Sequence, residues 1–200
     1  MRSTQDDGRE NSQLKTFGLL PYSNKRSNKY LPDGKINIEG EEYLVELKTA
    51  EDKGRSTLVS TGRGVDQNKI NKWKKVFWIF SKYRKILNTK GQSFELTGDH
   101  YFCLGSWLNP WFEKHPLKKV NEGTDKFGGL ILLDEVLNIL ENEISDEDLS
   151  RVKETYTRGT RQNDPRMSWE NVVKKYCKKI DTTRPKEHLK ELIIETKNKR

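Results

Sequence analysis

Two acidic residues and a lysine stand at a spacing that suits the hydrolysis of phosphodiester bonds. Asp33 follows Pro32, twelve residues separate Asp33 from Glu46, and Lys48 lies two residues further on. Residues two apart on a β-strand point to the same face, so Glu46 and Lys48 would lie side by side. Cleaving a phosphodiester adds negative charge to an anionic centre, and a divalent cation held by carboxylates offsets that charge. The pattern therefore favours metal-assisted hydrolysis.

The Pro-Asp dipeptide and the Glu-Leu-Lys tripeptide together resemble the active-site signature of the PD-(D/E)XK nuclease superfamily, which includes most type II restriction endonucleases. The resemblance implies that Asp33 and Glu46 bind the metal, Mg²⁺ with Mn²⁺ as a substitute. The backbone carbonyl of Leu47 would be a further ligand. Lys48 would orient the attacking water and stabilise the charge that develops on the phosphate.

The same resemblance implies contributions from two helices. Many members carry an additional catalytic acid on the first helix, and Glu10 is the best-placed candidate, with Asp6 and Asp7 as alternatives. On the helix that follows the signature, Gln67 or Lys69 would touch the site or the DNA. A solvated polar surface explains these residues as well, so we treat them as candidates.

The short motif by itself occurs by chance in so charged a chain. The pattern acid–any–Lys occurs at Asp33–Lys35, Glu46–Lys48, Glu51–Lys53 and Glu195–Lys197. Only the pair Glu46–Lys48 lies within an alternating apolar segment and follows Pro-Asp at the distance of a hairpin. An ordinary strand with its charges in water is the competing interpretation. The order of the surrounding elements favours the nuclease interpretation.

Those elements begin with a β-hairpin over residues 35–49, in which apolar and polar residues alternate around a turn at Glu39-Gly40. A short strand is expected at 57–60. A helix begins after Asp66, where Val65 and Ile70 have the spacing of a hydrophobic staple. Buried strands are expected at 76–80 and 101–104, and helices at 133–140, from Ser145, at 169–176 and from Pro185.

This order predicts an α+β fold with a restriction-endonuclease-like αβββαβ core, a mixed central sheet and a helical C-terminal part. We expect residues 1–120 to form the nuclease core. Residues 121–200 would form a helical region for DNA contact or dimerisation, packed against the core as one unit. The segment 133–140, which lies in an acidic stretch, would pack on protein and not on DNA.

Charge is segregated along the chain, which carries a net charge of +8. Residues 121–150 hold nine acids and one base, whereas residues 151–200 hold fifteen bases and seven acids. Residues 52–90 hold eleven bases and two acids. Two basic blocks thus flank an acidic spacer, which is the electrostatic pattern of a protein that binds nucleic acid.

Two basic loops are the candidates for DNA contact, because they mix Arg with short side chains that donate and accept hydrogen bonds. Their candidate residues are Arg55, Ser60, Thr61 and Arg63 in one loop, and Arg158, Arg161, Gln162, Asn163 and Arg166 in the other. A charged loop without a ligand is the competing interpretation for each.

The sequence thus predicts a Mg²⁺-dependent, site-specific endonuclease for double-stranded DNA that acts as a homodimer. A junction resolvase, a mismatch or repair endonuclease, and a non-catalytic nucleic-acid-binding module are the alternatives. No stretch approaches the roughly 18 apolar residues of a membrane span. Two cysteines are too few for a disulfide framework. We therefore expect a cytoplasmic protein of bacterial, archaeal or phage type without a membrane partner.

Overall fold

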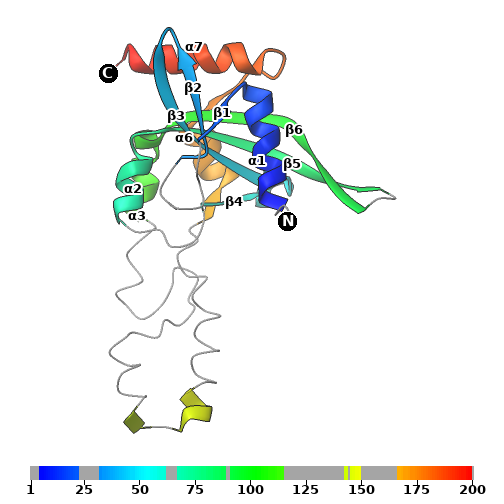
Figure 1. Cartoon of the computed structure of the whole chain (residues 1–200), viewed down its shortest axis with the longest axis vertical. Coiled ribbons are helices and arrows are strands. Elements are labelled where there is room, and N and C mark those ends of the chain that lie inside the picture. Colours follow the sequence, from blue (N-terminus) through cyan, green and yellow to red (C-terminus); the bar gives the residue numbers. More distant parts are fainter. Residues whose placement is uncertain are drawn as a thin grey trace.

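The computed structural model describes residues 5–22, 32–61, 67–88, 91–114, 142–143, 145–149 and 166–199. Figure 1 labels most of the elements. In chain order they are α1 (Gln5–Phe17), β1 (Leu20–Pro21), β2 (Gly34–Ile38), β3 (Glu41–Glu51), the 3-10 helix η1 (Gly54–Ser56), β4 (Leu58–Ser60), α2 (Gln67–Trp73), β5 (Phe77–Asn88), β6 (Gly91–Leu104), the 3-10 helix η2 (Gly105–Leu108), α3 (Asn109–Lys114), β7 (Arg166–Ser168), the π-helical turn η5 (Trp169–Val173), α6 (Lys174–Tyr176), β8 (Lys178–Lys179) and α7 (Pro185–Lys197).

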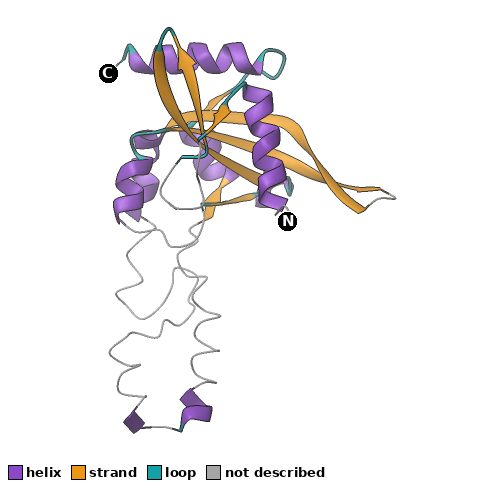
Figure 2. Ribbon diagram, in the orientation of Figure 1, coloured by secondary structure: helices purple, strands orange, loops and turns teal. Residues whose placement is uncertain are grey.

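A six-stranded mixed sheet forms the centre of the fold, in the order β1-β2-β3-β5-β6-β8. Strands β3 and β5 run parallel, and the other neighbouring pairs are antiparallel. A separate two-stranded sheet pairs β4 with β7. Helices pack around the strands (Figure 2). The α+β class predicted from the sequence is confirmed.

Each face of the large sheet covers its own apolar core. Along β5, Phe77 and Ile79 belong to the core with α1 and α7, while Trp78 and Phe80 belong to the core with α2, α3 and η5. Alternate residues of a strand point to opposite faces, so a strand covered on both sides must be apolar almost throughout. This explains the unbroken aromatic run at the start of β5.

The β2–β3 hairpin turns at the predicted dipeptide. Glu39 and Gly40 both have positive φ, 54° and 88°. Two consecutive left-handed residues match the twist of the flanking strands, and glycine adopts this conformation without a steric cost. The turn therefore fixes the register in which Gly34 lies opposite Val45.

The structure differs from the sequence-based expectation in two places. Strands β5 and β6 are longer than the predicted 76–80 and 101–104, because their polar outer halves pair with each other from Arg84 to Asn88. The C-terminal part is not only helical, since β7 and β8 each join a sheet. The predicted cap at Ser145 is present, with the Asp148 amide donating to its hydroxyl at 3.2 Å. The predicted helix at 133–140 lies outside the described residues.

Candidate active site

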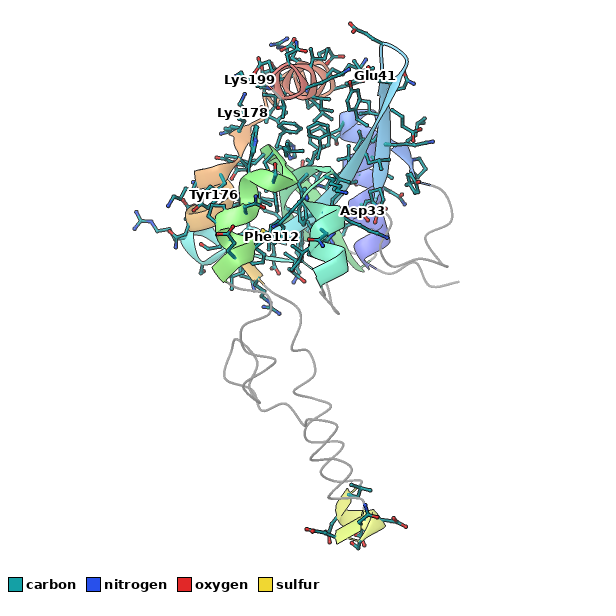
Figure 3. The ribbon with its side chains drawn as sticks, turned by 90° about the vertical axis from the view of Figure 1, so that its left-hand side faces the viewer. Asp33, Glu41, Phe112, Tyr176, Lys178 and Lys199 are labelled. Carbon is teal, nitrogen blue, oxygen red and sulfur yellow. The ribbon has the colours of Figure 1, made fainter. Side chains whose placement is uncertain are left out.

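Asp33 lies at the end of the β2–β3 hairpin opposite to the turn. Its backbone N–H donates to the carbonyl of Val45 at 3.1 Å, and its carboxylate accepts from the N–H of Leu47 at 2.7 Å. Strand β3 continues past the point where β2 begins, so this carboxylate pairs with the edge of β3 where the partner strand is missing. In Figure 3, Asp33 and Glu41 lie at opposite ends of the hairpin, with Asp33 at the end beside α1.

Lys48 joins the two predicted acids. Its Nζ lies 2.5 Å from Oε1 of Glu46 and 3.9 Å from Oδ2 of Asp33. Burial alone lowers the pKa of this ammonium, but the carboxylates of Glu46 and Asp33, with a smaller contribution from Glu10, raise the pKa above its usual value. Lys48 is therefore a protonated cation at neutral pH. The structure brings together the two acids and the lysine that the hairpin spacing predicts.

The strand that carries these residues is buried on both faces. Val45 and Leu47 lie in the core beneath α1, and only 6% of Glu46 is exposed on the opposite face. The Lys48 ammonium lies 5.8 Å from the centre of the Trp78 ring. A one-residue slip of β3 would exchange Glu46 and Lys48 with core residues, so the cores hold the register of the site.

A cleft of about 510 Å³ opens beside this cluster. Residues from α1, β3, β4 and β7 form its walls. The side chains that matter most are the acids Glu10, Asp33 and Glu51, the bases Arg9, Lys48, Lys53 and Arg166, and the hydroxyls of Ser56, Ser60 and Tyr83. The cleft thus has an acidic group around Lys48 and further cations along its walls, which suits an anionic substrate that meets a bound metal.

Helix α1 supplies two residues to this site. Glu10 lines the cleft and acts electrostatically on Lys48, and its role as an additional catalytic acid stays a prediction. Gln13, which the sequence analysis missed, is 1% exposed. Its amide donates to the carbonyl of Lys48 at 3.2 Å and to the hydroxyl of Ser81 at 2.8 Å. Because a buried amide must be hydrogen-bonded, Gln13 connects α1 to the backbone of β3.

The residues present fit a divalent cation. Asp33, Glu46 and Glu10 surround the single ammonium of Lys48, which leaves the cluster with an excess of negative charge. The N–H and C=O of one residue point to the same side of a strand, so the carbonyl of Leu47 faces the same edge as Asp33. Two carboxylates and a carbonyl are a donor set that Mg²⁺ accepts. Among the described residues, no three His, Cys, Asp or Glu side chains form a ready metal cage.

The other predicted contacts fall into three groups. Ser60 and Arg166 lie directly opposite each other in the β4–β7 pair, and both line the cleft. Arg55 is exposed on η1 but does not line it. Thr61, the residue after β4, is only 1% exposed, and its contact with DNA stays a prediction. Outside the described residues or side chains lie Asp6, Asp7, Arg63, Gln67, Lys69, Arg158, Arg161, Gln162 and Asn163.

Three further polar residues of the cleft that the sequence analysis missed are Arg9, Lys53 and Tyr83. Arg9 lies over the ring of Tyr83, 4.6 Å from its centre, and donates a hydrogen bond to its hydroxyl. Tyr83 lies in β5, 74 residues from Arg9 along the chain. Packing between distant segments brings these groups together, and no local sequence pattern predicts such a contact.

No protein-family model matches this chain, and no curated protein is found to match its sequence. The interpretation of the cleft therefore depends on its own geometry.

In the part of the chain that the structure describes, no helix combines the length and the apolar character needed to cross a membrane.

Proposed function

We propose that this protein is a Mg²⁺-dependent endonuclease that hydrolyses double-stranded DNA at specific sites, in the manner of the type II restriction enzymes of the PD-(D/E)XK superfamily. One observation carries the proposal. Asp33 and Lys48 line one end of a cleft whose walls hold three further cations, Arg9, Lys53 and Arg166, and the buried Glu46 pairs with Lys48 beside that cleft. A surface strand with its charges in water would not bury Glu46 and pair it with a partly buried lysine.

Each residue has a role that follows from its position. Asp33 and Glu46, with the carbonyl of Leu47, would hold the metal. A bound Mg²⁺ supplies charge compensation for the phosphate and lowers the pKa of a coordinated water. Lys48, whose ammonium form the carboxylates of Glu46 and Asp33 favour, would donate hydrogen bonds that orient the attacking water and stabilise the charge of the transition state.

The cationic walls support a polyanionic substrate. Lys53 lines the cleft just after β3, Arg166 lines it from β7, and Arg9 lines it from α1. Guanidinium and ammonium groups bind phosphates without regard to base sequence. The hydroxyls of Ser56 and Ser60 add neutral donors along the same walls. The DNA backbone would therefore follow the cleft, with one phosphate at Lys48.

The deciding experiment is cleavage of supercoiled plasmid DNA with Mg²⁺ and with EDTA. We expect cutting by the parent protein with Mg²⁺ only, and a loss of at least about a hundredfold for Lys48→Ala, because several kcal/mol of transition-state stabilisation disappear. The matched control is Lys35→Ala in the same hairpin, whose partner is Glu42 at 2.7 Å and which does not line the cleft. A parent without metal-dependent cutting, or an undiminished Lys48→Ala, would refute the proposal.

The same assay separates the rival functions. Discrete fragments from plain duplex DNA would support site-specific cleavage, and cutting confined to branched or mismatched duplexes would assign the cleft to a structure-specific nuclease. A module that only binds DNA would keep every activity in Asp33→Asn and Glu46→Gln. We include a homodimer in the proposal, because two copies related by a two-fold axis can cut both strands of a palindromic site. Sedimentation of the protein on a cleavable duplex would measure this stoichiometry.

A further inference from the structure

Strands β5 and β6 continue beyond the rest of the sheet. The last residue of β5 that pairs with β3 is Tyr83, and β8 pairs with β6 only at Tyr101 and Phe102. Further out, the described backbone of Arg84–Asn88 pairs with that of 91–95. Figure 1 shows this pair of strands extending past the neighbouring elements. We call the outer part, 84–88 with 91–95, the β-ribbon.

The base of the β-ribbon is fixed next to the cleft. Lys85 forms an ion pair with Glu51 at 2.8 Å, and Glu51 lines the cleft. The Phe94 ring packs edge-on against Tyr83, another cleft residue, with ring centres 6.3 Å apart. A Cβ atom at Gly8 of α1 would come within 3.2 Å of the same ring, so Phe94 lies close to this glycine. An isolated two-stranded ribbon is only marginally stable, so these contacts hold its direction relative to the site.

The exposed side chains of the β-ribbon suit nucleic acid. Arg84 is 73% exposed in its side chain, and Ile86, two residues on and on the same face, is 40% exposed. An exposed arginine beside an apolar side chain can bind guanine and contact a thymine methyl group. Ser93, which lies opposite Ile86 on the paired strand, adds a hydroxyl of the kind that binds phosphates.

We propose that the β-ribbon enters the major groove of the DNA whose backbone lies in the cleft, and that it reads base edges there. This inference rests on the proposed function, because the cleft fixes where the duplex runs. The major groove, about 12 Å wide, admits a two-stranded ribbon directly, whereas the minor groove, about 6 Å wide, admits one only when the duplex is deformed. The ribbon is therefore a specificity element separate from the residues that hydrolyse the bond.

The test measures binding and not cleavage. The duplex that the parent enriches most strongly from a random-sequence library is labelled with fluorescein and titrated in EDTA with the parent, with the double variant Arg84→Ala/Ile86→Ala and with Lys199→Ala. The control removes the same charge from a residue beyond α7, on the side of Glu41 and away from Asp33 (Figure 3). We expect affinity to fall about tenfold for the double variant, as for loss of a base-reading arginine, and less than twofold for the control. An affinity of the double variant within twofold of the parent would overturn the proposal.

A second arm identifies the groove. Glucosylated 5-hydroxymethylcytosine fills the major groove, and netropsin fills the minor groove. Glucosylated duplex should bind the parent about tenfold more weakly, and netropsin should leave binding unchanged; the opposite pattern would refute major-groove entry.

Plasmid cleavage is scored separately. If binding depends on the β-ribbon but the parent cuts no DNA, the proposed nuclease function is refuted and the role of the β-ribbon in binding stands. If the double variant cuts DNA with the parent's affinity and the parent's fragment pattern, the nuclease function stands and the role of the β-ribbon is refuted.

Discussion

At the scale of single residues, the carboxylate of Asp33 does two things. It caps the N–H of Leu47 at 2.7 Å and it contributes negative charge beside Lys48. An asparagine keeps an oxygen for the N–H but loses the charge, so Asp33→Asn separates the structural task from the metal-binding one. We expect Mg²⁺-dependent cleavage to fall about a hundredfold or more, with a thermal midpoint within a few degrees of the parent's. Cleavage at the parent's rate would show that the charge is dispensable.

His100 gives a residue-scale prediction for stability. Its side chain is 3% exposed, its Nδ1 lies 2.9 Å from the Ser81 hydroxyl, and burial lowers its pKa although Asp99 opposes this effect. The unfolded chain therefore takes up this proton at a higher pH than the folded one. The contribution of neutral His100 to the free energy of unfolding is therefore complete above pH 6.5. It is lost as pH falls through the lower pKa of the folded state, by at most about 1.4 kcal/mol per pH unit. In denaturant unfolding measured from pH 7 to 5, the free energy of unfolding should decline less steeply with falling pH for His100→Gln than for the parent. Equal pH dependence in the two proteins would contradict the lowered pKa of His100.

At the scale of elements, Gln13 couples α1 to two strands. Its amide reaches the carbonyls of Lys48 and Ile79 and the hydroxyl of Ser81. Gln13→Leu keeps the volume but leaves buried acceptors without this donor, which costs about 1–3 kcal/mol of unfolding free energy. Because the Lys48 backbone loses an anchor, we also expect kcat to fall more than the binding of DNA. A variant that loses stability but keeps kcat, measured where it is fully folded, would limit Gln13 to a structural role.

The hairpin elements were predictable because their information is local. The alternation through 35–49, the turn at Glu39-Gly40 and the spacing of Asp33, Glu46 and Lys48 all lie within one short segment. The outer halves of β5 and β6 were missed, since their polar side chains give no apolar period and only mutual pairing makes them strands. The burial of Thr61 was missed because β4 pairs with β7, about a hundred residues further along the chain.

At the scale of the whole molecule, binding of DNA should depend strongly on salt. Arg166 is exposed and lies at the cleft wall opposite Ser60. If its guanidinium neutralises one phosphate, Arg166→Ala reduces the slope of log affinity against log salt by about one and weakens binding to all duplexes alike. Fluorescence anisotropy between 50 and 300 mM NaCl measures this slope. An unchanged slope would place Arg166 outside the backbone contact.

The walls of the cleft come from widely separated parts of the chain, with Arg9 in α1 on one side and Arg166 in β7 on another. The ribosome synthesises the β2–β3 hairpin early and the β7 wall more than a hundred residues later. In the proposed nuclease, a nascent chain would therefore contain the proposed metal-binding residues before it contains Arg166, which lines the cleft. The order of synthesis would then delay full DNA binding until the chain is nearly complete.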